Sequence, residues 1–479
     1  MATDRETGIL SGMSINGPLG ATPQTGSFEL RAPAHARQAA ARTRLGRFAL
    51  AGVLLSGLVL CVSAAHTNTL LPETVRPVPA SLAGPFANLG LHLGVGVLAA
   101  LMSLMFVAYV VAVREAERLS PRMVLMAVGA LNALVLLAPP LLSTDIFSYQ
   151  AYAREWITYS SNPYLSGPHI MMLDPLYPYV GAKWIGTPTV YGPLFTAMSA
   201  FLGPVSVAVS ALTYKALAGL ASLATIALLW HGARLRGLNP ARAVALFGLN
   251  PLVTVYGVGG GHNDLLMLVL TTAGVCALLS HRERTSGAMI TAGAAIKLTG
   301  GLILPFALVA GVELGSAKRR RAVLVGAALT ALAIAAVSFS LFGLGILNLV
   351  PTLHQVQAEG DWHSIPGFIT SALGLGGLGE VAGIALGVVF VAVFGWLLRR
   401  VWRRQMDWID GAAWATLAML LTASSVLPWY VAWLLPLVAL CTDRRLWRWS
   451  LVLSGVMLAT TMLGYIPHGS TFLGIPVVP

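Results

Sequence analysis

Residues 123–154 have the sequence MVLMAVGALNALVLLAPPLLSTDIFSYQAYAR, in which an apolar run ends abruptly in a polar segment. Such a run, of about 20 residues, is long enough to cross a bilayer as a helix. If a helix begins again at Ser143 or Thr144, the side chains at i, i+3, i+4 and i+7 share one face. These are Asp145, Ser148, Tyr149 and Tyr152. A carboxylate at the mouth of a membrane helix is costly unless the protein uses it, so we predict that Asp145 is the centre of an active site.

The composition of the whole chain points to a membrane protein. Hydrophobic residues make up 56% of its 479 residues and charged residues 10%, and the mean hydropathy is +0.76. Soluble domains carry about 25% charged residues. Apolar runs of about 17–25 residues recur from residue 48 to the C-terminus. The sequence therefore predicts an all-α polytopic membrane protein with about thirteen transmembrane helical segments.

The positive charge of the chain is a topology signal. The net charge is +12, and all but five of the 30 Lys and Arg residues lie in the N-terminal arm or in short clusters between apolar runs. Placing every cluster, and the N-terminus, in the cytoplasm gives one self-consistent topology, and it argues against nucleic-acid binding. The five residues outside the clusters are Arg76, Arg154, Lys183, Lys215 and Lys297.

This topology divides the chain into an arm, a membrane domain and a tail. Residues 1–46 lack sustained apolar periodicity and are predicted to be a disordered cytoplasmic arm. Residues 47–465 form the membrane domain, with outer loops at 143–187 and 346–377, and residues 466–479 form an outer tail. The many aromatic residues of the first outer loop favour short helices that lie in the membrane interface.

Residues 287–315 have basic residues on both flanks, so both ends are expected in the cytoplasm. This stretch is too short for two full crossings of about 20 residues each. It breaks at Lys297, which is followed by Leu-Thr-Gly-Gly, and this predicts a short helical hairpin with Lys297 at its tip. Broken helices at membrane depth need a wet cavity or protein neighbours around them. We therefore expect Lys297 to face a cavity.

A second polar turn, GGGHND at residues 259–264, is expected on the same side of the membrane as Asp145. Each feature has a simple structural alternative: Asp145 could cap a helix, the turn could be a plain loop, and Lys297 could snorkel to the interface. Together, however, the three segments offer a general base, neutral hydrogen-bonding groups and a cation that could bind a phosphate.

The remaining candidates are also open to two interpretations. Lys215 could bind a phosphate or snorkel, and Trp429 and Tyr430 could line the cleft or form an interfacial belt. His262 and Asp264 could hold a divalent cation, but one histidine and separated acids are weak evidence for a metal, so no metal site is predicted. The cysteines lack metal-ligand spacing and are interpreted as buried free thiols: Cys61, Cys276 and Cys441.

Five motifs occur in one order along the chain. They are 145–149 (DIFSY), 191–195 (YGPLF), Asn250-Pro251 leading to 261–264 (GHND), 295–298 (AIKL) before Pro305, and 428–430 (PWY). With the predicted topology, this series resembles the polyprenol-phosphate-mannose-dependent α-1,6-mannosyltransferases of mycobacteria and corynebacteria, members of the GT-C glycosyltransferase superfamily. The resemblance covers roughly residues 48–465.

The resemblance implies a GT-C fold in the cell (plasma) membrane, with the active site on the outer face and a lipid-linked sugar as donor. It implies that Asp145 is the general base of an inverting transfer of mannose from polyprenyl-phosphate-mannose. The implied acceptor is an α-1,6-mannan or a lipomannan-type glycolipid. No Asp-Asp pair or Asp-x-Asp motif follows Asp145, so the acid partner expected near it is not identified.

The polar segments and the resemblance together give the candidate site residues. Lys297 is expected to balance the charge of the departing phosphate, with Arg154 and His262 as lesser candidates. The other candidate substrate contacts are Ser148, Tyr149, Tyr152, Tyr191, Asn263, Asp264, Trp429 and Tyr430.

Two other functions stay open at this point. A transporter or flippase for a polyprenyl-linked glycan would also need a phosphate-binding lysine and an apolar groove, although the sequence has no convincing internal repeat. An enzyme of the same superfamily could use another lipid-linked sugar, such as arabinofuranose or glucose. The identity of the sugar depends on the shape of the pocket, which the sequence does not reveal.

Overall fold

The computed structural model describes residues 34–66, 70–87, 89, 91–313, 317–359, 364–367, 379–463, 471–472 and 475–476. The chain forms two compact units, Met1–Ala41 and Arg42–Pro479. The pocket and its surroundings belong to the second unit.

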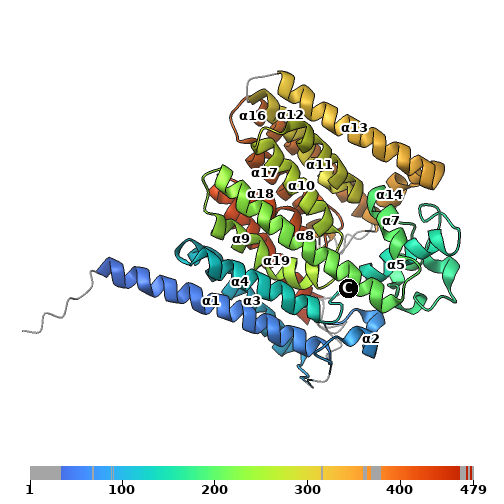
Figure 1. Ribbon diagram of the computed structural model, residues 1–479, viewed down its shortest axis with the longest axis horizontal. Helices are drawn as coiled ribbons and strands as arrows, with labels where there is room; N and C mark the ends of the chain where they lie inside the picture. The colour runs from blue at the N-terminus through green and yellow to red at the C-terminus, as the bar shows by residue number, and fades with distance from the viewer. Residues whose placement is uncertain are drawn as a thin grey trace, which may run out of the picture. The chain divides into compact units, whose positions relative to one another are not determined.

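The described residues fold almost entirely into helices (Figure 1). The longest helices are α1 (Ala34–Ala64), α3 (Val95–Glu115), α4 (Pro121–Leu137), α8 (Val207–Leu235), α13 (Ala317–Phe342), α16 (Gly379–Trp402) and α19 (Arg444–Leu463). Those of intermediate length are α5 (Asp145–Ile157), α9 (Pro240–Gly248), α10 (Asp264–Leu279), α11 (Glu283–Ile296), α12 (Leu304–Glu313), α14 (Leu349–Ala358) and α17 (Trp408–Thr422). The shortest are α2 (Ala80–Ala83), α6 (Ala182–Ile185), α7 (Pro193–Ser199) and α18 (Leu435–Leu440).

Short irregular helices connect these elements. One is a π-helix, η6 (Leu252–Val258). The others are 3₁₀ turns: η1 (Glu73–Val75), η2 (Ala116–Arg118), η3 (Pro168–Met171), η4 (Tyr177–Tyr179), η5 (Ala200–Leu202), η7 (Leu298–Ile303), η8 (Gly343–Asn348) and η10 (Pro428–Trp433). The strands found in the described residues are β1 (Thr471–Phe472) and β2 (Ile475–Pro476), which pair antiparallel with Thr471 opposite Pro476.

The predicted class, an all-α polytopic membrane protein, is confirmed. Among the described residues, 5 helices are long and apolar enough to cross a membrane: Ala40–Ala64, Val95–Arg118, Val207–Leu235, Ala317–Ala358 and Glu380–Trp402. The pair Pro240–Gly248 and Leu252–Val258, bent by 50°, is a further candidate. Several shorter apolar helices accompany them, among them α4, α10 and η10 with α18. The predicted number of about thirteen segments stays a prediction.

The clearest difference from the predicted organisation is at the N-terminal arm. Helix α1 begins at Ala34, so residues 34–46, which were expected to be disordered, are helical, whereas residues 1–33 lie outside the described residues. Residues 34–46 are rich in Ala and Arg, which are strong helix formers, and they continue without interruption into the apolar run. Of the predicted second outer loop, η8 and α14 are described, and of the tail only β1 and β2.

The predicted break at Lys297 is confirmed. Helix α11 ends at Ile296, Lys297 has an extended backbone (φ −149°, ψ 125°), and η7 begins at the next residue. Glycines let α11, the helix before this break, pack closely against α13. A Cβ added at Gly287 on α11 or at Gly326 on α13 would lie 2.1 Å or 2.0 Å from a backbone oxygen of the other helix, so only glycine permits this approach. Before α7, Gly192 donates its N–H to Ile296 O at 3.0 Å.

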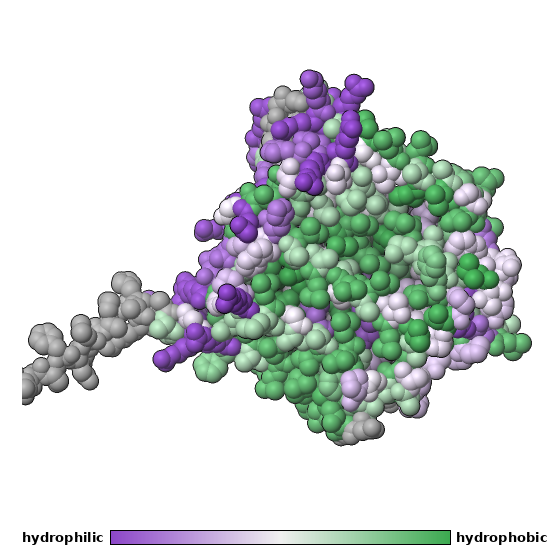
Figure 2. All heavy atoms as spheres, in the orientation of Figure 1, coloured by the Kyte–Doolittle hydropathy of each residue, from purple (hydrophilic) through white to green (hydrophobic). Residues whose placement is uncertain are grey.

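The helices place the polar elements at one end of the second unit. Figure 1 shows α5, α7 and α14 close together at the right of the view. Figure 2 shows a broad hydrophobic zone over the middle, and hydrophilic residues gathered where α13 begins and α16 ends. The start of α13 has the sequence AKRRR and the last turn of α16 contains Arg399 and Arg400. This is an end that the positive-inside rule assigns to the cytoplasm, an orientation that stays a prediction.

Candidate active site

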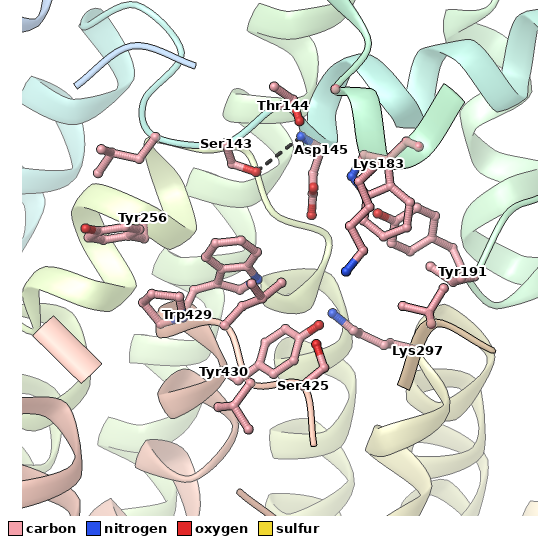
Figure 3. Close-up of a pocket in the computed structure, with 18 of the residues that line it drawn as sticks. Ser143, Thr144, Asp145, Lys183, Tyr191, Tyr256, Lys297, Ser425, Trp429 and Tyr430 are labelled. Atoms are coloured by element: carbon pink, nitrogen blue, oxygen red, sulfur yellow. Dashed lines mark hydrogen bonds between the residues drawn. The ribbon is translucent and has the colours of Figure 1, made fainter. Parts of the chain in front are cut away.

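A pocket with a volume of about 730 Å³ brings several of the predicted site residues together. Pockets for small ligands commonly have volumes of about 300–1,000 Å³. Its polar lining includes Asp145, Lys183, Tyr191, Lys297 and Tyr430 (Figure 3). Another part of the lining is apolar and comes from η7, α14 and α17: Leu298, Leu302, Leu353, Val356, Met419 and Leu420.

Asp145 enters the pocket from the first residue of α5. The segment before it is tied to the turn at 259–264, because Leu141 donates its N–H to Gly259 O at 3.0 Å. Leu142 has a φ of 62°, a conformation that a leucine adopts rarely and at a cost in energy. The N–H of Asp145 donates to Ser143 Oγ at 3.2 Å. The Asp145 side chain is 12% exposed, and its carboxylate points into the pocket in Figure 3.

The pKa values of two carboxyl groups on α5 are shifted in opposite directions. Burial raises the pKa of Asp145, but the contact with His262 and the positive charge of Lys297 outweigh burial and hold this pKa below its ordinary value. Glu155 is fully buried and neither of its carboxyl oxygens has a hydrogen-bond partner among the described residues. Burial raises the pKa of Glu155 to about 9. At neutral pH, Asp145 is therefore the carboxylate of this helix that can accept a proton.

The predicted polar turn lies directly beside Asp145. His262 is fully buried, and Nδ1 of its ring lies 3.5 Å from Asp145 Oδ2. The ring stacks on Trp429, with centroids 3.8 Å apart and an interplanar angle of 24°. Trp429 lines the pocket, whereas His262 lies behind it. This placement does not support the predicted role of His262 as a phosphate ligand, because its ring is directed at the carboxylate.

Lys297 lines the pocket, so the prediction that it faces a cavity is confirmed. Its charge already has a partner: Nζ donates to Asp264 Oδ1 at 2.7 Å. Nζ also lies 4.6 Å and 5.1 Å from the ring centroids of Tyr430 and Trp433. The indole N–H of Trp433 donates to the same carboxylate oxygen at 2.6 Å. Asp264 is buried and lies outside the pocket lining, so its position does not support the predicted contact with substrate.

Lys183, to which the sequence assigned no role, also faces the pocket. In Figure 3 the ammonium groups of Lys183 and Lys297 point into the same space beneath the Asp145 carboxylate. None of the ion pairs between described residues involves Lys183. Its side chain lies on α6, with Nζ 5.7 Å from the Trp184 ring centroid. The sequence did contain an indication that Lys183 belongs to the site, because Lys183 is one of the five basic residues outside the predicted cytoplasmic clusters.

The predicted substrate contacts of α5 form an aromatic layer behind the pocket. Tyr149 is buried and packs edge-on against Tyr191 and Phe195, each with centroids 4.8 Å away. The hydroxyl of Tyr152 donates to a backbone carbonyl at 2.9 Å, and Ser148 is fully buried. Of the four predicted hydroxyl-bearing residues between 148 and 191, only Tyr191 lines the pocket. The other three support its wall.

Arg154 lies outside the pocket lining, which corrects its predicted role in phosphate binding. Its guanidinium pairs with Asp174 and donates to Gly203 O at 3.0 Å and Val205 O at 2.8 Å. Arg154 follows Asp145 by nine residues, which on a helix of about 3.6 residues per turn places it on the opposite face. Its function is to join α5 to the segment before α8.

Lys215 is fully buried on α8 and neither snorkels nor reaches the pocket. Its ammonium donates to the carbonyl oxygens of Ala138 and Pro139, the second at 3.1 Å. These carbonyls follow the end of α4 and would otherwise be unsatisfied. Both sequence-based interpretations of Lys215 are therefore wrong, and the residue holds the segment that leads to Asp145.

The remaining candidates are buried beside the site. Asn263 precedes α10, and its side-chain oxygen lies 3.4 Å from the Tyr149 hydroxyl. Within the described residues, no group of three or more His, Cys, Asp and Glu side chains is arranged to hold a metal ion. The three cysteines are buried free thiols, as predicted.

The fold and the pocket define a polytopic helical membrane protein with a site suited to an amphiphilic anion. A family model described as alpha-(1→6)-mannopyranosyltransferase, N-terminal domain, matches residues 49–313. A second, described as MptB C-terminal domain, matches residues 363–479. The chain belongs to the alpha-(1→6)-mannopyranosyltransferase family, and the resemblance seen in its motifs is confirmed.

Individual relatives carry the same name. Alpha-(1→6)-mannopyranosyltransferase A of Mycobacterium tuberculosis is 30% identical over 337 residues, which cover 65% of this chain and 64% of the relative. Alpha-(1→6)-mannopyranosyltransferase B of Corynebacterium glutamicum is 24% identical over 391 residues, 73% of this chain and 63% of the relative. Alpha-(1→6)-mannopyranosyltransferase A of the same organism is 28% identical over 186 residues, 37% of each chain. The match thus spans less than two thirds of the length of each relative.

Proposed function

We propose that this protein is an integral-membrane mannosyltransferase. It moves mannose from polyprenyl-phosphate-mannose to a hydroxyl group of an α-1,6-mannan or lipomannan-type acceptor on the outer face of the plasma membrane. The observation that carries the proposal is the meeting of the Asp145 carboxyl group with the side-chain nitrogens of Lys183 and Lys297 in one pocket. The family supports the sugar and the linkage, because the relatives bear the name of that reaction.

Asp145 acts as the general base of an inverting displacement. It takes the proton of the acceptor hydroxyl while that oxygen forms a bond to the anomeric carbon from the face opposite the phosphate. The bond between the anomeric carbon and the phosphate oxygen breaks, and its electron pair leaves with polyprenyl phosphate. The proton stays on Asp145 until it is released to solvent. A positioned base contributes about 10²–10⁴-fold to such a rate.

Lys183 and Lys297 bind the donor phosphate and stabilise the negative charge that it gains as the bond breaks. The charge of Lys297 is shared with Asp264 at 2.7 Å, whereas no ion pair in the described part of the chain involves Lys183. Lys183 therefore supplies a positive charge that is in no ion pair with a described carboxylate, and Lys297 supplies a fixed hydrogen-bond donor. This arrangement replaces the expected set of Lys297, Arg154 and His262.

The apolar side of the pocket receives the lipid of the donor. Leu298, Leu353 and Met419 are among the side chains of this wall, which three separate elements contribute. A nucleotide sugar has no group that would gain from such a surface, whereas a polyprenyl chain buries apolar area against it. The wall therefore supports a lipid-linked donor.

The test is transfer in proteoliposomes that contain purified wild-type protein or Asp145→Asn, radiolabelled polyprenyl-phosphate-mannose and a short α-1,6-mannoside. Wild-type protein is expected to extend the mannoside, and the variant to do so at least about 100-fold more slowly. Transfer that persists in the variant refutes the base assignment. If no lipid-linked sugar is transferred while the labelled lipid crosses the bilayer, the protein is a flippase. Transfer from another lipid-linked sugar, such as a glucose or arabinofuranose donor, corrects the donor.

A further inference from the structure

His262 is a fully buried histidine whose polar atoms have no assigned function. Neither ring nitrogen makes an ordinary hydrogen bond to any described residue. Leaving a buried polar group without a partner costs free energy, so such a group in a native protein calls for an explanation. The polar atom that Nδ1 approaches is Asp145 Oδ2, at 3.5 Å.

The turn before His262 is shaped around its ring. A Cβ added at Gly260 would lie 2.8 Å from His262 Nε2 and 2.9 Å from Cδ2, so only glycine leaves room for the imidazole there. Gly261 has a φ of +66°, which favours glycine, and a Cβ at this position would lie 2.6 Å from Ile146 Cγ2 on α5. The two glycines therefore let the turn approach α5 closely and bring the ring to the carboxylate.

An aromatic side chain of the pocket lining, Trp429, also restrains the His262 ring. The Trp429 indole stacks on the imidazole with centroids 3.8 Å apart. The ring thus stacks on the indole and lies close to Gly260, and both neighbours restrain it from rotating away from Asp145. A plain packing role needs no such alignment of a nitrogen with the carboxylate.

We propose that His262 is a positioning residue for the transfer reaction: its Nδ1–H donates to Asp145 Oδ2, which leaves Oδ1 directed at the acceptor hydroxyl. The inference rests on the proposed function of Asp145 as the base. The distance of 3.5 Å is longer than an ordinary N–H···O bond. Catalytic hydrogen bonds are often long until substrate binds, and this one is expected to shorten when donor and acceptor fill the pocket.

The proposal predicts a change in the pH dependence of the base. A donor on Oδ2 favours the ionised carboxylate, so its removal raises the pKa of Asp145 and moves the acid limb of kcat/KM to higher pH. The other titratable groups of the pocket and of its wall stay in place when His262 is replaced. They are Glu73, Arg76, Lys183, Tyr191, Tyr256 and Tyr430 in the lining, Lys297 with Asp264, and Tyr149 and Tyr152 behind the wall. A shift of the acid limb can then be assigned to His262.

Two substitutions of His262 distinguish a role in positioning Asp145 from a role in packing against Trp429. His262→Asn places an amide N–H near the position of Nδ1 but has no ring to stack on Trp429. His262→Phe keeps a ring for stacking but has no donor. The purified variants are compared in proteoliposomes for kcat, KM and the pH profile, per amount of folded protein as measured by thermal unfolding.

His262→Phe is expected to lower kcat by about tenfold to hundredfold, with the KM of donor and acceptor nearly unchanged, and to shift the acid limb upward by about one pH unit. His262→Asn is expected to keep the wild-type limb and most of the rate. The reverse ranking, with Phe active and Asn inactive, shows that the ring only packs. Equal pH profiles for all three proteins overturn the proposal even where the rates differ.

A second measurement separates this inference from the proposed function. The carboxyl stretching band of Asp145 is followed by infrared titration and assigned by its loss in Asp145→Asn. In His262→Phe the midpoint of this titration is expected at higher pH than in the wild type and in His262→Asn. This result does not depend on mannose transfer, so a protein without transfer activity and with a shifted midpoint refutes the function but not the pairing. An unshifted midpoint refutes the pairing.

Discussion

Lys183 and Lys297 face the same pocket, but only the charge of Lys297 is also needed to pair with a buried carboxylate. Lys297 neutralises the buried Asp264 at 2.7 Å, whereas Lys183 is an exposed side chain of α6. Lys183→Met is expected to lower kcat/KM for the lipid donor by about tenfold to hundredfold, with stability changed by less than about 0.5 kcal/mol. Lys297→Met is expected to lower activity similarly and also to destabilise the protein by about 3–5 kcal/mol, because it leaves Asp264 unpaired. Donor kinetics and thermal unfolding measure the two effects.

The control removes both charges of the pair. Lys297→Met combined with Asp264→Asn is expected to recover most of the lost stability without recovering transfer, because no buried charge is left unpaired. The Asn oxygen can still accept the hydrogen bond from the Trp433 indole. Equal destabilisation by Lys183→Met and Lys297→Met contradicts this account of the two lysines.

Glu155 provides a matched comparison for Asp145, since both carboxyl groups are buried on α5. Burial raises the pKa of Glu155 to about 9, so its side chain is neutral at pH 7 and Glu155→Gln is expected to leave transfer unchanged. Its effect on stability depends on pH. Once the pH exceeds the ordinary value of about 4.3, the unfolded chain loses a proton that the folded protein keeps.

The stability of the wild type relative to Glu155→Gln should therefore fall by about 1.4 kcal/mol per pH unit as the pH rises from near 5 towards 9. The difference should level off above the folded pKa. Thermal unfolding of both proteins over this range tests the sign. A constant difference means that Glu155 is ionised, or is exposed, in the folded protein.

At the scale of the elements, α5 is anchored by its far end. Arg154 joins it to the segment before α8 through Asp174, Gly203 and Val205. Arg154→Lys keeps the charge but loses the planar fork that serves three partners. We expect it to destabilise the protein by about 1–3 kcal/mol and to leave the KM of the donor unchanged. Hydrogen exchange of residues 200–206 should increase. A raised donor KM with unchanged protection would restore the phosphate role that the sequence suggested.

The elements themselves were predictable because each has a local cause. Apolar runs gave the helices, and the sequence Lys-Leu-Thr-Gly-Gly gave the break that carries Lys297. The face on which Arg154 lies could also have been predicted from the sequence, because its spacing from Asp145 places it on the opposite face of the helix. The local sequence could not predict which residue pairs with each charged side chain of the site. The ion pair of Lys297 with Asp264 depends on the packing of α11 against α10, which local sequence does not reveal.

The same limit applies to His262. The sequence singled out its turn, but the direction of its ring follows from stacking on Trp429 and from the close approach of Gly261 to Ile146, and both partners lie far away in the chain. For Lys215, the sequence suggested roles that the structure does not support. A lysine within an apolar run is expected to snorkel or to bind a ligand, yet here it satisfies two backbone carbonyls after α4. Backbone demands of this kind are not visible in a hydropathy pattern.

At the scale of the whole molecule, the proposed reaction requires that the pocket open away from the cytoplasm. Asp145 and Lys183 both lie in the segment 143–187, which the positive-inside rule places outside. The turn between α16 and α17 contains Arg403 and Arg404 and should lie in the cytoplasm. The native cysteines are all buried, so a thiol reagent should label the folded protein only weakly. New cysteines can therefore report on the two sides.

Leu173 lies in the outer segment and is 99% exposed, and Arg403 is exposed in the basic turn. In intact cells, a membrane-impermeant maleimide is expected to label Leu173→Cys at once and Arg403→Cys only after the membrane is permeabilised. Both reactions are expected to be much faster than any labelling of the native protein, because a thiol must be exposed to react. The reverse pattern would place the pocket in the cytoplasm, where its donor would have to be loaded from the inner leaflet. Labelling of both positions in intact cells would place Leu173 and Arg403 on the same side of the membrane and contradict the predicted topology.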